Sequence, residues 1–199
     1  MKLSLTQMPE LKEAILSLPE KEKDKLLTRL INKDQMLIKQ MHFKLLENED
    51  DLLDRAHEAK MQIIESMKVL EKMMQKANFN KKYDYINMHA RMLSGVVNEH
   101  ASITKDKVSE LELRLLILKL CFNQYSSLYT VEFYNKYADK HFDYIAGRVK
   151  AILAIYDKLH PDLQYDYKEQ LMQVLEFVSM SDLLKKLAQK NISILEYFD

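Results

Sequence analysis

The chain has 199 residues, of which 47% are hydrophobic and 30% are charged, and its 30 basic residues equal its 30 acidic residues in number. This composition is typical of a globular protein and excludes a disordered one. The neutral charge balance provides no long-range field that would attract a polyanion or an anionic membrane surface. Because only two glycines and three prolines interrupt the chain, residues that stop helices are rare, and we predict an all-α fold.

The first 47 residues are predicted to form short helices. Pro9 and Pro19 each suit the first turn of a helix, where the missing N–H costs nothing. Asp34 precedes a third apolar stripe and is predicted to cap that helix. Short helices with tight links resemble the pattern of α-solenoid repeats, but the chain has no self-similarity at a period of roughly 30 to 45 residues.

The remainder of the chain is predicted to form longer helices, because apolar residues recur every three or four positions over longer stretches. The clearest stop and restart is His160-Pro161-Asp162. A helix over 106–126 is apolar on most sides, and we expect it to be the central one. The predicted helices cover 48–76, 81–101, 106–126, 131–159 and 161–178, followed by a short helix capped by Ser181.

These elements predict a multi-helix bundle or an α-α superhelix of eight to nine helices, with the short N-terminal helices packed on the longer ones. We expect a single domain over 1–199, and a subdivision into 1–47 and 48–199 is left open. Gly95 and Gly147 lie inside predicted helices. Since glycine weakens a helix by about 1 kcal/mol relative to alanine, we expect both positions to serve close approach between helices.

The single cysteine, Cys121, lies in an apolar run and is predicted to be a buried small hydrophobe. One thiol without a disulfide framework is typical of a reducing compartment, so we expect a cytoplasmic protein without a signal peptide. The most hydrophobic window, 111–122, is interrupted by Arg114 and Lys119. It is far shorter than the ~20 residues that cross a bilayer, so we predict no membrane span.

One acidic cluster suggests a metal site, because Asp54 and His57 have the acid-x-x-His spacing found in ferritin-like di-iron proteins. That signature needs a second copy, and no other segment provides one. Acidic residues at the start of a helix are also favoured by the helix dipole alone. We therefore predict no metal ligands and no cofactor. The absence of a Gly-rich phosphate loop agrees with this expectation.

Three histidines lie on apolar faces or at their edges. His89 and His100 share one predicted helix, and eleven residues separate them by about 16 Å along its axis, so they do not share a metal ion. His141 lies at the edge of another stripe. Hydrogen-bonded core histidines are the favoured interpretation of all three. Together with the mid-helix position of Cys121, this leaves no predicted catalytic residue.

An aromatic series is the most suggestive feature of the sequence. If the helix is continuous, Tyr125, Tyr129, Phe133 and Tyr137 fall on one face, and we name them as a candidate partner-binding face. Packing in the core is the competing interpretation. Base stacking is less favoured, because only Lys136 accompanies these rings. A small basic patch on the last helix, made of Lys185, Lys186 and Lys190, is a weak signal for phosphate binding.

The sequence thus predicts a non-enzymatic cytoplasmic protein-interaction or regulatory module, with a protein partner or self-association and no membrane. Long amphipathic helices, abundant tyrosine and methionine, and the lack of a catalytic motif motivate this hypothesis. Two alternatives remain: a protein that binds single-stranded nucleic acid through the aromatic face, and a helical metal-dependent enzyme that uses Asp54 and His57.

Overall fold

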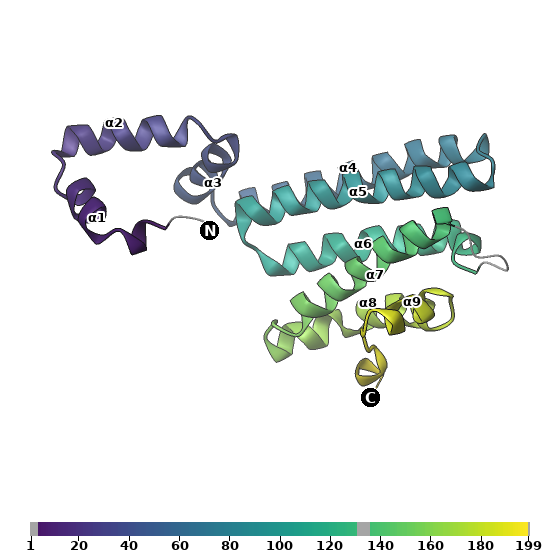
Figure 1. The fold of residues 1–199 in the computed structure, drawn as a ribbon. Coiled ribbons are helices and arrows are strands. Elements are labelled where there is room, and N and C mark those ends of the chain that lie inside the picture. Colours follow the sequence, from purple (N-terminus) through teal and green to yellow (C-terminus); the bar gives the residue numbers. More distant parts are fainter. Residues whose placement is uncertain (1–3, 131–135, 199) are drawn as a thin grey trace. The chain divides into compact units, whose positions relative to one another are not determined.

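The computed structural model describes residues 4–130 and 136–198, and within these ranges the chain forms nine α-helices and no strand. The all-α prediction is therefore confirmed (Figure 1). The chain divides into two compact units, Met1–Asn48 and Glu49–Asp199. This boundary lies one residue beyond the point where the sequence changes from short to long helices. The packing of the short helices on the longer ones stays a prediction.

The N-terminal unit contains three helices of 8 to 12 residues and one 3-10 turn. Pro9 stands at the first position of α1, as predicted, and the Asp34 carboxylate accepts hydrogen bonds from the backbone N–H groups of Met36 and Leu37 at the start of α3. Contacts join η1 to α1 and α2 to α3. The elements are η1 (Leu5–Gln7), α1 (Pro9–Leu16), α2 (Glu20–Ile31) and α3 (Gln35–Leu46).

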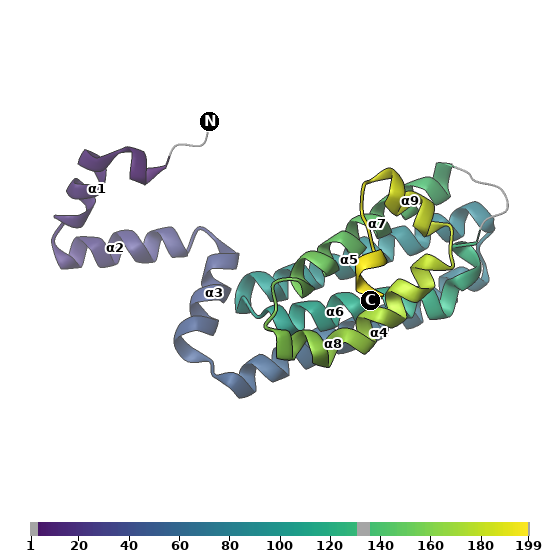
Figure 2. The ribbon, with the colours of Figure 1, turned by 90° about the horizontal axis from the view of Figure 1, so that it is seen from below.

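The C-terminal unit is a bundle built on long helices. Its elements are α4 (Glu49–Gln75), α5 (Phe79–Thr104), α6 (Lys107–Tyr125), η2 (Ser126–Leu128), α7 (Lys136–Tyr156), α8 (Pro161–Ser179), α9 (Leu183–Gln189) and η3 (Leu195–Tyr197). Short links make α4 and α5 antiparallel neighbours, and α9 packs on α7 and α8 (Figures 1 and 2). Pro161 opens α8, as the sequence predicts.

Helix α6 is the centre of this bundle. It contacts α4, α5, α7 and α8, and its buried residues lie on several sides of the helix rather than on one stripe. The prediction that this segment is central is therefore confirmed. The contiguous hydrophobic core extends from α4 through α6 and α7 to α9, and includes Ile63, Leu115 and Phe142. This core belongs to the residues after Asn48 alone.

The expected reason for the two glycines is wrong. A Cβ atom built on Gly95 or Gly147 meets no atom within 4 Å, apart from the neighbouring backbone of its own helix. Neither glycine permits a close approach between helices of this chain, and neither has a positive φ. Nothing in the structure explains why these positions are not alanine.

Candidate functional site

The aromatic series does not form one continuous helical face. Helix α6 ends at Tyr125, and a 3-10 turn over Ser126–Leu128 follows. Tyr129 is completely buried, so its place in the candidate partner-binding face is corrected: it is a core residue. Tyr125 and Tyr137 are half-buried and pack against the core, whereas Phe133 lies outside the described residues. A partner-binding role for Tyr125 or Tyr137 stays a prediction.

Tyr129 lies in a buried aromatic cluster of the bundle. Its ring stacks on Phe142 at 5.9 Å between centroids and meets Phe122 edge-on at 5.0 Å. Its hydroxyl lies 3.0 Å from Nε2 of His141. Cys121 is buried nearby, as predicted, and burial raises the pKa of its thiol to about 12. The thiol is therefore protonated near neutral pH and is not an activated nucleophile.

All three histidines that the sequence places on apolar faces are buried and hydrogen-bonded, so that interpretation is confirmed. Nδ1 of His89 lies 2.9 Å from the Ser66 hydroxyl, and Nε2 of His100 lies 2.7 Å from the Ser109 hydroxyl. Burial lowers the pKa of His89 and of His100, and it lowers the pKa of His141 to about 3. Each imidazole is thus neutral at pH 7.

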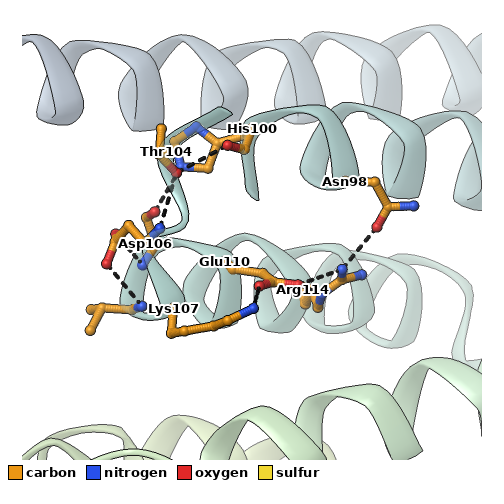
Figure 3. Close-up of polar contacts among 9 residues, drawn as sticks. Asn98, His100, Thr104, Asp106, Lys107, Glu110 and Arg114 are labelled. Carbon is orange, nitrogen blue, oxygen red and sulfur yellow. Dashed lines mark hydrogen bonds and ion pairs between the residues drawn. The ribbon is translucent and has the colours of Figure 1, made fainter. Parts of the chain in front are cut away.

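The turn between α5 and α6 holds a polar network (Figure 3). The Thr104 hydroxyl donates to the carbonyl of His100 and accepts from the backbone N–H of Asp106. The Asp106 carboxylate in turn caps α6 by accepting from Val108 and Ser109. Lys105 ends α5 in the left-handed conformation, with φ at 58°. These contacts fix the turn.

Further along α6, a buried carboxylate forms an ion pair that joins this network (Figure 3). Glu110 accepts from Arg114 at 2.7 Å and from Lys107 at 2.7 Å, and Arg114 also donates to Asn98 on α5 at 2.8 Å. Burial alone would raise the pKa of Glu110, but the hydrogen bonds from Lys107 and Arg114 hold it below its usual value. The network therefore cross-links α5 and α6 with a charged carboxylate.

A polar cleft of about 280 Å³ lies between α4 and α5. His100 lines this cleft together with charged groups that include Arg55, Glu58 and Glu99. The His100 ring is hydrogen-bonded to the hydroxyl of Ser109, and serine is a residue type that can act as a nucleophile. Both residues, however, are buried. Among the described residues, no carboxylate bonds the His100 ring to orient it as a base. The pair serves to tie α5 to α6.

Two other clusters that the sequence suggests are the acidic cluster with His57 and the basic patch on the last helix. Across the described residues, no three His, Cys, Asp or Glu side chains lie close enough to hold a metal ion, so Asp54 and His57 find no third ligand. His57 instead lines an open groove between α4 and α6. The basic patch on α9 is neutralised, because Lys186 and Lys190 form ion pairs with Asp143 of α7 and Lys185 pairs with Asp182.

The N-terminal unit exposes many of its large apolar side chains. Over residues 4–48, no residue is buried as a whole, although the Glu47 side chain is only 8% exposed. Eight large apolar side chains are between 41% and 73% exposed: Leu5, Met8, Leu11, Leu16, Leu27, Leu30, Leu45 and Leu46. We call these eight residues the N-terminal apolar surface. Such exposure departs from the burial expected for amphipathic helices.

Comparisons of this chain with protein-family models, with curated proteins and with solved structures find no significant match. In the part of the chain that the structure describes, no helix combines the length and the apolar character needed to cross a bilayer. The fold and the site therefore define the class of protein only as an all-α helical bundle preceded by a short-helix unit.

Proposed function

We propose that this protein is a non-enzymatic, cytoplasmic protein-interaction module that binds an amphipathic helix of a partner protein through its N-terminal apolar surface. The observation that carries the proposal is that residues 4–48 form three helices and bury none of their apolar residues. Isolated helices of this length are marginal in water without tertiary packing. Covering the N-terminal apolar surface would supply that packing.

The charges of the N-terminal unit favour an apolar and nearly neutral partner. On α2, basic and acidic residues alternate, so no single sign of charge dominates that helix. Exposed leucines at helical spacing, such as Leu27 and Leu30, suit the apolar stripe of a second helix. A polyanion such as nucleic acid would find little electrostatic attraction here.

The non-enzymatic part of the proposal is supported by the state of the reactive groups in the bundle. His89, His100 and His141 are neutral and hydrogen-bonded in the interior, and the Cys121 thiol is protonated. These groups act as packing and cross-linking residues. The lone cysteine supports the cytoplasmic part, because secreted proteins usually carry disulfides.

Site-specific photo-crosslinking tests the proposal. A photoreactive amino acid replaces Leu30 in the full chain, which is expressed in its native host, and the cross-linked products are identified by mass spectrometry. We expect a cross-link to one other protein, which is then purified for binding measurements. L27E should weaken that binding by about tenfold or more, because a charge is buried against an apolar helix. The matched control, L195E, alters an exposed leucine of the other unit and should leave binding unchanged.

Three outcomes would overturn the proposal. Cross-links confined to residues 49–199 of the same chain would mean that the chain covers its own apolar surface. Cross-links between two copies, with a dimer in light scattering, would mean self-association instead of a partner. Equal binding by L27E and the unsubstituted chain would place the partner on another surface.

A further inference from the structure

A tyrosine joins α5 and α7 in the bundle. The Tyr144 hydroxyl of α7 lies 3.1 Å from the carbonyl oxygen of Ala90 and 2.6 Å from the Ser94 hydroxyl, both on α5. These contacts hold the phenol ring against α5. The ring is therefore a rigid platform at the seam between two long helices.

Two guanidinium groups lie against this one ring. Cζ of Arg91, from α5, is 4.6 Å from the ring centroid, and Cζ of Arg148, from α7, is 5.0 Å from it. The two Cζ atoms are therefore no more than 9.6 Å apart. The negative face of the ring attracts each cation, which offsets part of their mutual repulsion. We call Arg91, Tyr144 and Arg148 the arginine–tyrosine cluster.

Among the described residues, no ion pair neutralises the positive charge of the arginine–tyrosine cluster. Among the described residues, neither arginine has a carboxylate within ion-pair distance, whereas Arg114 is paired with Glu110. Nε of Arg148 is buried and has no hydrogen-bond acceptor among the residues that the structure describes. The positive charge of Arg91 also acts on the interior, because its electrostatic repulsion contributes to the low pKa of the buried His141.

We propose that the arginine–tyrosine cluster binds a phosphoryl group. Planar guanidinium forks donate paired hydrogen bonds to phosphate oxygens, and stacking on an aromatic ring fixes each fork in advance. A dianion would neutralise both cations at once. A diphosphate spans a wider gap than a single phosphate, so it is the better fit for two guanidiniums that reach one ring from different helices. This inference is independent of the N-terminal apolar surface.

Arginine side-chain NMR of the full chain tests this site. The Nε–Hε signals of Arg91 and Arg148 are followed at low salt and pH 7 during titration with inorganic phosphate, pyrophosphate or a phosphoserine peptide. We expect saturable shifts of both signals, with pyrophosphate binding more tightly than inorganic phosphate. Tighter binding of the phosphopeptide would identify the source of the phosphoryl group as a partner protein.

Charge-removing variants make the test specific. R91Q and R148Q should each weaken pyrophosphate binding by about tenfold or more, since each removes charge-assisted hydrogen bonds. K150Q removes an exposed charge from the same helix and is expected to change affinity by less than about twofold. Thermal melts of each variant establish that it is folded. The absence of shifts up to about 10 mM ligand, or an equal loss of binding in K150Q, would overturn the proposal.

Discussion

The hydroxyl of Tyr129 and Nε2 of His141 lie 3.0 Å apart in the interior of the bundle, and both residues are completely buried. The other ring nitrogen, Nδ1 of His141, is buried without a partner among the described residues. The interior therefore holds a neutral imidazole with one nitrogen hydrogen-bonded. Protonation of this ring would place a charge in an apolar environment.

Acid should therefore destabilise the bundle. The pKa of His141 is lowered from 6.5 to about 3 by burial and by the charge of Arg91. Below pH 6.5 the unfolded chain binds a proton that the folded chain does not, so the stability present above pH 6.5 is lost as the pH falls toward 3. This one histidine should lower the unfolding free energy by about 1.4 kcal/mol per pH unit within that window. Urea unfolding at several pH values measures the slope.

H141Q is the control for this prediction. A glutamine carbonyl can still accept from the Tyr129 hydroxyl but does not titrate, so the dependence on pH should become flatter. His89 and His100 contribute in the same direction, because burial lowers their pKa values too, and some slope should remain. An unchanged slope in H141Q would contradict the assignment.

Loss of one partner from the Glu110–Arg114 pair should be costly. R114M leaves the Glu110 carboxylate buried without its closest guanidinium, and we expect a loss of about 3–5 kcal/mol in unfolding free energy. Lys107 is mostly exposed, so K107M should cost less than about 1 kcal/mol. Calorimetric or urea unfolding compares the two variants. Equal losses would mean that Arg114 does not hold the buried charge.

Both glycines should be replaceable with a gain in stability. G95A and G147A add a methyl group that meets no atom within 4 Å. Since alanine loses less backbone entropy in a helix, each should raise the unfolding free energy by about 0.5–1 kcal/mol. The reverse change A146G, at a fully buried site next to Gly147, should lower it. A destabilised G95A would show that the space above Gly95 is filled in solution.

Hydrogen exchange should separate the two units of the free chain. Amides of α1, α2 and α3 lack a buried core beneath them, so we expect them to exchange far faster than those of α6. Mass spectrometry of peptides from the full chain provides the comparison. Protection of α2 equal to that of α6 in the isolated chain would contradict an uncovered N-terminal apolar surface.

Several helix starts followed from sequence because their causes are local, whereas the predicted cap Ser181 is wrong, since the N-cap of α9 is Asp182. Caps at Asp34 and Asp106 and the proline at 161 act on backbone groups within a few residues, so they can be identified without tertiary information. The burial of Cys121 was predictable for the same reason, since apolar neighbours surround it on its own helix. The sequence left Tyr129 open between a partner-binding face and the core. The structure decides for the core, because a 3-10 turn follows Tyr125 and Tyr129 is completely buried.

Pairings between distant residues required the tertiary structure. The ion pair of Lys186 with Asp139 joins residues 47 positions apart, and the contact of Tyr144 with Ser94 spans 50. The spacing of apolar side chains along the sequence determines which face of a helix is apolar. The sequence by itself therefore determined an all-α chain with a central helix near 106–126. Only the packing of those helices decided which charges are neutralised and that Arg91 and Arg148 share one ring, because such contacts depend on how separate helices are placed against each other.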